Sequence, residues 1–302
     1  MTAGAAAAAI RIGARFPSAG VAFAAGGMAS AARILEDAGY DSLWASDHLA
    51  MPRGRSSSVY PYSGDGRIPW GSDLGWNEAL TSLGIAAGVT CRIELGTAVL
   101  VAALRHPLLA ARQAAAVAVE AGGRVTLGIG AGWLIEEFEA VGVPFVDRGR
   151  YLDHWIPYVR DVWAGTVAVH GPEDPYPNPE ELTSLPMPPD RIGLVIGGMS
   201  SAALRRTVQL GDGWIGIVAM DGLDVGKVGA QIQRLRAEAE LARRDPKELR
   251  VLLQVTGSAG RMQELRPHLE PLAAAGVDDI LIDVDWRDPD QPAKDLQSLR
   301  DH

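Results

Sequence analysis

The chain has 302 residues, of which 47% are hydrophobic and 22% charged, a composition typical of a globular protein and not of a disordered one. Its formal net charge of −9 argues against a nucleic-acid-binding surface, which needs concentrated positive charge. The one cysteine, Cys91, excludes an internal disulfide framework and a cysteine-cluster zinc site, and it agrees with a reducing compartment.

The N-terminal residues read MTAGAAAAAIRIG, with no basic residue near the start. We interpret them as a flexible alanine-rich lead and not as a signal peptide. No uninterrupted apolar run reaches the roughly 18 residues that a membrane span requires, so no contact with a membrane is predicted. We therefore expect a cytoplasmic protein.

Short β-branched runs alternate with longer helical patterns along the rest of the chain. The predicted strands cover 10–16, 41–48, 92–100, 124–131, 191–197, 213–218, 249–256 and 278–285. The predicted helices cover 27–38, 77–90, 107–120, 134–140, 149–164, 200–210, 222–243, 262–274 and the stretch after Pro292. Two stretches lack periodicity and are predicted as loops: 49–76, and 165–190 with its seven prolines.

Eight strand–helix units with strands apolar on both faces predict a closed (β/α)8 barrel. An open, doubly wound sheet can produce the same alternation, but the count of eight favours the barrel. No break in composition divides the chain, so we predict one domain over 1–302 that includes both loops. Functional groups in such a barrel lie on the loops at the carboxyl ends of the strands.

Asp47 and His48 follow the second predicted strand and form the first candidate site. A histidine at the end of a strand can exchange a proton near neutral pH. Asp47 could orient that histidine or accept a hydrogen bond from a ligand. The alternative is an aspartate that caps a turn beside a structural histidine.

Glycines mark the end of the fourth strand at Gly128, Gly130 and Gly132. Their GxGxG spacing does not match the GxGxxG fingerprint of dinucleotide-binding proteins. These small residues could let a flat ring approach the backbone, or they could serve tight packing and a turn.

A second glycine pair, Gly197 and Gly198, precedes Ser200 and Ser201 at the start of a predicted helix. Exposed amide groups and the helix dipole favour an anion there, so the pattern predicts a phosphate cradle. The alternative is an ordinary serine N-cap. The six histidines show no metal-binding spacing, and no metal site is predicted.

Five stretches together resemble the luciferase-like monooxygenase superfamily, and especially its probable coenzyme F420-dependent oxidoreductases. They are DSLWASDHL at 41–49, YPYSGDGRIPW at 60–70, and the longer stretches 93–115, 122–153 and 196–215. The fold of that superfamily is a (β/α)8 barrel, which agrees with the strand count.

The resemblance implies roles for residues that the strand ends already indicate. His48 corresponds to an active-site histidine near the reactive carbon of the cofactor ring, and Asp47 to a residue that contacts the ring. Ala98 and Val99 fall where relatives have a non-proline cis peptide in a bulge behind the ring. The remaining cofactor-binding positions are Gly130, Ala131 and Gly132 beside the ring, and Gly197, Gly198 and Met199 in a phosphate-binding loop.

The chain departs from some members of the superfamily in two places. Trp133 stands where certain sugar-phosphate dehydrogenases have a glutamate as catalytic acid, so their substrate and full mechanism do not transfer. The loop 49–76 carries Tyr60, Tyr62, Trp70 and Trp76. These aromatic residues suit a flat or apolar substrate, or they form a lid that packs on its own side chains.

The resemblance therefore implies hydride transfer between F420 and a small organic substrate. One alternative is an FMN-dependent monooxygenase that uses reduced flavin and oxygen. Another is a barrel that binds a cofactor without catalysis. Dimers are usual among relatives, so we expect a homodimer.

Overall fold

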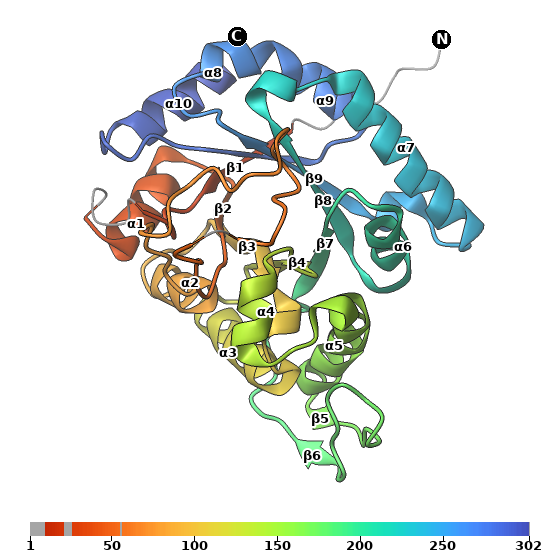
Figure 1. Ribbon diagram of the computed structural model, residues 1–302. Helices are drawn as coiled ribbons and strands as arrows, with labels where there is room; N and C mark the ends of the chain where they lie inside the picture. The colour runs from red at the N-terminus through yellow and green to blue at the C-terminus, as the bar shows by residue number, and fades with distance from the viewer. Residues whose placement is uncertain (1–9, 21–25, 55, 302) are drawn as a thin grey trace, which may run out of the picture.

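The computed structural model describes residues 10–20, 26–54 and 56–301, and the alanine-rich lead before residue 10 lies outside them. Eight parallel strands close into a barrel in the order β1-β10-β9-β8-β7-β4-β3-β2 (Figure 1). The strands are β1 (Arg11–Arg15), β2 (Ser42–Ala45), β3 (Glu94–Val101), β4 (Val125–Gly130), β7 (Gly193–Gly197), β8 (Gly213–Ala219), β9 (Arg250–Thr256) and β10 (Asp279–Ile282). The predicted barrel is confirmed, because β1 pairs with both β2 and β10.

Helices surround the barrel close to the predicted positions. They are α1 (Met28–Ala38), α2 (Ala79–Ala87), α3 (Pro107–Glu120), α4 (Ile135–Val141), α5 (Arg148–Trp163), α6 (Ser201–Leu210), α7 (Val225–Leu241), α8 (Met262–Leu265), α9 (Leu269–Ala275) and α10 (Gln291–Arg300). The helix predicted over 262–274 is divided by a 3-10 turn at Arg266–His268, where Pro267 cannot donate a backbone hydrogen bond. No helix in the described part of the chain is long and apolar enough to cross a membrane.

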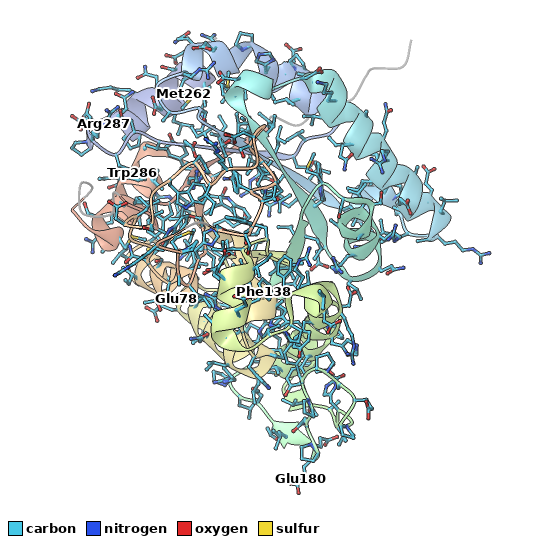
Figure 2. The ribbon with its side chains drawn as sticks, in the orientation of Figure 1. Glu78, Phe138, Glu180, Met262, Trp286 and Arg287 are labelled. Atoms are coloured by element: carbon cyan, nitrogen blue, oxygen red, sulfur yellow. The ribbon has the colours of Figure 1, made fainter. Side chains whose placement is uncertain are left out.

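The proline-rich insertion 165–190 differs from its prediction as an unstructured loop. It contains a short antiparallel pair, β5 (Thr166–Val167) and β6 (Leu182–Thr183). Strands of two residues have no periodicity that a sequence could reveal, and the pairing joins positions far apart along the chain. The insertion extends away from the barrel, and Glu180 marks its far end (Figure 2).

The middle of the barrel is filled by Trp44, whose side chain is fully buried. A Cβ atom on Gly96 would lie 2.4 Å from this ring, so a glycine is required on the neighbouring strand. The Trp44 indole donates a 2.8 Å hydrogen bond to the Ser42 hydroxyl. Other apolar side chains pack around it: Ala98, Val195, Ile215, Leu252 and Leu281.

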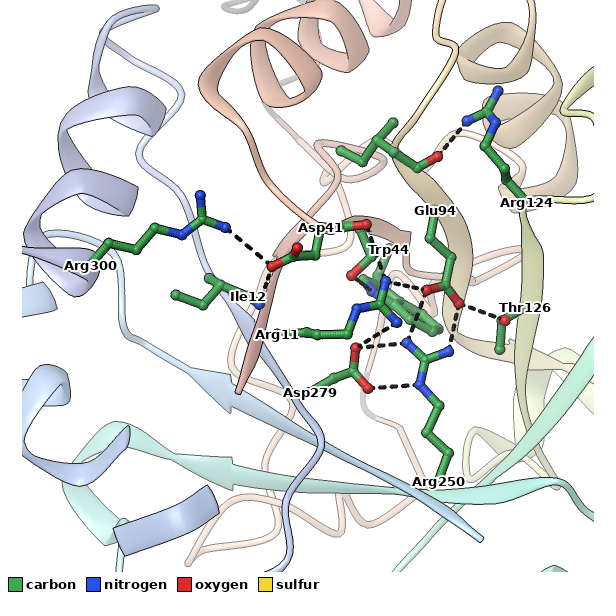
Figure 3. A network of polar contacts seen from close by, with 12 residues as sticks. Arg11, Ile12, Asp41, Trp44, Glu94, Arg124, Thr126, Arg250, Asp279 and Arg300 are labelled. Carbon is green, nitrogen blue, oxygen red and sulfur yellow. Dashed lines mark hydrogen bonds and ion pairs between the residues drawn. The ribbon is translucent and has the colours of Figure 1, made fainter. Parts of the chain in front are cut away.

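An ionic network closes the amino-terminal end of the barrel (Figure 3). Arg250 donates two hydrogen bonds of 2.7 and 2.9 Å to Glu94 and two of 2.7 Å to Asp279. Arg11 and Thr126 each donate a further 2.7 Å bond to the Glu94 carboxylate. Burial alone would raise the pKa of Glu94, but the hydrogen bonds and charge of Arg250 lower it to about 2.

Glu94→Gln should lower the free energy of unfolding by roughly 3 kcal/mol near neutral pH, because Arg250 and Arg11 lose their shared carboxylate. The lowered pKa of Glu94 stabilises the fold above pH ~4.5, and this contribution disappears as the pH falls toward ~2. Urea unfolding at about pH 6 and about pH 3.5 should show a smaller acid-induced loss in the variant. The exposed Glu240→Gln serves as control, and equal pH dependence in both variants would contradict this role.

Candidate active site

The barrel mouth carries His48, three residues after β2 ends, enclosed by indole rings. Ring centroids lie 4.7 Å from His48 for Trp76, 5.6 Å for Trp133 and 6.1 Å for Trp70. Tyr60 packs on both Trp70 and Trp133, at 5.2 and 5.1 Å. The aromatic side chains of the loop 49–76 thus pack on one another and on the histidine, as the lid alternative predicts.

Glu137, on α4, is the buried hydrogen-bond partner of the histidine. Its Oε2 lies 3.0 Å from His48 Nδ1, and its side chain is only 2% exposed. Its Oε1 accepts hydrogen bonds from the amides of Leu49 and Ala50, at 2.5 and 3.2 Å. The buried carboxylate therefore fixes both the imidazole and the chain that follows it.

Sequence reasoning missed Glu137, and only a weak signal could have found it. Glu136 and Glu137 are the acidic residues in the first turn of the helix that follows β4, where a helix dipole favours negative charge. That position places them near the mouth but does not reveal their partners. Trp133 stands where some relatives have an acid. Glu137, four residues further along the chain, provides a carboxylate that contacts the histidine.

The neighbouring Glu136 fixes a second part of the same loop. Its carboxylate accepts hydrogen bonds of 2.8 and 2.7 Å from the hydroxyls of Ser56 and Ser58, and one of 2.9 Å from the amide of Ser57. The Ser58 hydroxyl in turn accepts from the Ile135 amide at 2.7 Å. Two adjacent glutamates of α4 therefore fasten the loop at 49–50 and at 56–58.

Asp47 is buried and faces a different set of partners. Arg105 donates two hydrogen bonds to its carboxylate, at 2.7 and 2.8 Å, and the Val101 amide donates a third at 2.9 Å. Burial disfavours the charge of Arg105, yet the Asp47 carboxylate raises the pKa of the guanidinium above its ordinary value. Asp47 joins the loops after β2 and β3, and the ring contact that the resemblance implies stays a prediction.

The peptide bond Ala98–Val99 is cis, and the β3–β4 register shifts between Thr97 and Leu100. The predicted bulge is therefore present. A Cβ atom on Gly130 or Gly197 would lie 3.0 or 2.9 Å from the Val99 side chain. These two glycines make room for Val99, which agrees with the packing alternative for the glycine pattern.

Gly132 and Ala131 continue from β4 toward α4. Gly132 has a φ of +84°, and a Cβ there would lie 2.6 Å from Val101 and 2.8 Å from Phe138. Ala131 packs against the main core. Both residues shape the turn that places α4 and its glutamates over the mouth, where Figure 2 labels Phe138.

The loop after β7 leads directly into α6. Ser200 is the N-cap and accepts a 3.2 Å hydrogen bond from the Ala203 amide, as the capping alternative predicts. Gly198 has a φ of +125°, which favours glycine. Arg234 of α7 donates to the Ser201 hydroxyl at 3.1 Å, so a cation stands beside this helix start.

Met199 lies in the same loop, and its side chain is 43% exposed. Its carbonyl accepts a 3.1 Å hydrogen bond from Gln231 of α7. The structure thus brings Val99, Gly130 and Gly197 into contact, whereas no contact joins Gly198 or Met199 to His48 among the described residues.

Glu137→Gln should loosen the loop, because a buried carboxylate that accepts three hydrogen bonds becomes a neutral amide. Losing charged hydrogen bonds of this kind costs about 1–3 kcal/mol. Amide hydrogen exchange over 49–58 should therefore become about ten- to a hundredfold faster. Glu139→Gln, on the exposed side of the same helix, is the matched control, and equal exchange in the two variants would exclude this anchoring role.

Comparison with known proteins identifies the family. The luciferase-like monooxygenase profile matches residues 7–287. An uncharacterized protein of Mycobacterium tuberculosis is 35% identical over 223 residues, which cover 73% of this chain and 74% of that protein. An F420-dependent glucose-6-phosphate dehydrogenase of Beutenbergia cavernae is 33% identical over 187 residues, which cover 60% of this chain and 49% of the dehydrogenase.

Solved structures share the fold at low sequence identity. An F420-dependent secondary alcohol dehydrogenase, in complex with an F420–acetone adduct, gives a TM-score of 0.74 at 16% identity and covers 97% of this chain and 100% of that chain. The coenzyme F420-dependent tetrahydromethanopterin reductase from Methanopyrus kandleri gives 0.70 at 14% identity, with 96% and 98% covered. The profile spans most of the sequence, and the chain therefore belongs to the luciferase-like monooxygenase family.

Proposed function

We propose that the protein is an oxidoreductase that uses F420 to transfer a hydride to or from a small organic substrate. The observation that carries the proposal is the buried contact between Glu137 and His48 at the barrel mouth, 3.0 Å long. Family membership and the F420-dependent dehydrogenase relatives support the choice of cofactor. The protein would act on its substrate in the cytoplasm.

Three features of the mouth fit a flat, phosphorylated cofactor. The bulge at Ala98–Val99 would form the floor under a ring. The start of α6, with Gly197, Gly198 and the guanidinium of Arg234, would hold a phosphate. The Trp76 indole N–H is buried and has no acceptor among the described residues, so a bound ligand could supply one. When bound, a deazaflavin supplies the ring carbon that gives or takes the hydride.

The chain's own residues then control the proton. The Leu49 and Ala50 amides donate to Glu137, so its carboxylate acts as an acceptor, and in the proposed mechanism the hydrogen of the His48 contact lies on Nδ1. Nε2 is left to accept a proton from the substrate or, once protonated, to stabilise charge on a substrate oxygen. The indoles of Trp76 and Trp133 pack in T-shaped contacts with the imidazole and keep it in place.

Titration with F420 and, separately, with FMN tests the cofactor. We expect F420 to bind with micromolar or tighter affinity and to change its absorbance during turnover of a substrate. Reduced FMN should consume oxygen no faster with the protein than without it, because free reduced flavin is oxidised by oxygen spontaneously. FMN binding with no affinity for F420 would overturn the proposed cofactor and favour the monooxygenase alternative.

His48→Ala should lower turnover about 10²- to 10⁴-fold, the contribution expected of a positioned proton-transfer group. The F420 dissociation constant should change only a few-fold, because the substitution removes no predicted anchor of the phosphate. His154→Ala, which changes a histidine of α5 that pairs with Asp174, is the control. Unchanged turnover in His48→Ala would remove its catalytic role.

We also propose that two chains associate through α2 and α3, which pack side by side. Their outer surface carries the apolar side chains of Ile85, Leu109 and Val119, which are 42%, 62% and 47% exposed. The exposed positions Gln113 and Ala116 between them are uncharged. Apolar surface of this kind commonly marks an interface.

Ile85→Glu should convert a dimer into a monomer, because a charge would be buried in the interface without a partner. Light scattering coupled to gel filtration measures the mass directly. Leu241→Glu, at an 81% exposed position on α7, should leave the mass unchanged. A wild-type protein that runs as a monomer would contradict the proposed association.

A further inference from the structure

A cavity of about 450 Å³ lies within the loop 49–76, between residues 52–54 and 56–58 on one side and 66–72 on the other. Its lining is mainly polar and includes the side chains of Arg53, Arg67 and Ser72. No acidic residue belongs to the lining among the described residues. Its lining residues therefore carry two positive charges, in a chain whose formal net charge is −9.

The two arginines of the cavity are not used by the fold. Arg53 makes no hydrogen bond or ion pair with any other described residue. The guanidinium of Arg67 contacts Asp65 at 3.7 Å, and the two side chains are 87% and 62% exposed. The Arg67 amide donates a 3.0 Å hydrogen bond to the same carboxylate. Exposed pairs of this kind contribute little to stability, so both guanidinium groups can bind another anion.

The carboxylate of Glu136 lies behind the cavity wall, and serines of the loop take up its hydrogen-bonding capacity. Ser56 and Ser58, which line the cavity, direct their hydroxyl hydrogens to this carboxylate. Burial would raise the pKa of Glu136, but the hydrogen bond from Ser58 helps to lower it. Glu136 therefore shapes the wall without competing for the arginines.

Trp70 joins the cavity to the candidate active site. It lines the cavity, and its ring centroid lies 6.1 Å from that of His48 and 5.8 Å from that of Trp76. Its indole N–H donates a 3.4 Å hydrogen bond to the Met51 sulfur, and this bond fixes the ring between the cavity and His48. A ligand at His48 that extends past Trp70 would place its far end near the arginines.

We propose that this cavity is an anion subsite, in which Arg53 and Arg67 bind a carboxylate or phosphate group of the ligand held at His48. Guanidinium groups match these anions because they donate paired, parallel hydrogen bonds. The assignment of the ligand to His48 rests on the proposed function, whereas anion binding by the cavity does not. The aromatic side chains of the loop thus face the histidine, while its polar side chains face the cavity and would bind the anionic group of the ligand.

Calorimetry with inorganic pyrophosphate, without cofactor, tests the subsite on the full chain. Arg53→Gln/Arg67→Gln should weaken binding at least about tenfold, since two charge-assisted contacts are lost. Arg53→Lys/Arg67→Lys should retain most of the affinity, because the charge remains. The surface variant Arg287→Gln should leave this binding event unchanged. Arg234→Gln, which alters the proposed phosphate site at the α6 start, identifies any second binding event there.

Two outcomes would overturn the proposal: no binding of pyrophosphate at millimolar concentration to the wild-type protein, or equal affinity in wild type and Arg53→Gln/Arg67→Gln. Binding of F420, and of its deazaflavin fragment that lacks phosphate and glutamates, is then measured in the wild type and the double variant. The comparison shows whether the anionic group comes from the cofactor or from the substrate. If the double variant loses affinity for F420 but not for the fragment, the anion belongs to the cofactor. If F420 binding is unchanged, the anion belongs to the substrate.

The same measurements separate this proposal from the proposed function. If neither F420 nor its fragment binds, but pyrophosphate binding still requires Arg53 and Arg67, the cofactor assignment fails and the anion subsite stands. If F420 binds and turns over a substrate while pyrophosphate binding is independent of both arginines, the cofactor assignment stands and the anion subsite fails.

Discussion

The buried carboxylate of Glu137 is the constraint on which the mouth of this barrel depends. One oxygen contacts His48, and the other accepts the amides of the two residues that follow it. Taking a carboxylate out of water is costly unless hydrogen bonds replace its hydration. Three donors do so here, and all of them come from one short segment. The position of the imidazole and the path of the loop are consequently set by the same interaction.

The loop 49–76 gains its order from this attachment and not from regular secondary structure. Glu136, one residue earlier, also binds the loop through its carboxylate, which accepts hydrogen bonds from serines and not from an imidazole. Trp70 and Trp76 of the same loop pack on His48, and its Arg53 and Arg67 remain without strong partners. A single segment thus presents aromatic rings toward His48 and two arginines toward a cavity, which is the arrangement on which both proposals rest.

The barrel beneath supplies rigidity at three levels. The Arg250 network closes its amino-terminal end, Trp44 fills its middle, and Val99 occupies the space that Gly130 and Gly197 leave at the top. In the middle and at the top, a bulky side chain fills space that glycines on other strands leave open. Several glycines of this sequence therefore serve packing inside the barrel. The loop 49–76 and helix α4 lie over this tightly packed interior.

The sequence by itself determined the eight strand–helix units, because apolar runs, glycine stops and Pro107 at a helix start are local signals. It also placed His48, Val99 and Gly197 at strand ends, where the fold concentrates function. It could not determine that Glu137 would meet His48, that Arg105 would meet Asp47, or that β5 would pair with β6. These contacts join residues 15 to 89 positions apart. Closure of the barrel and packing of α4 over its mouth bring the first two pairs together, and the folding of the insertion brings β5 to β6.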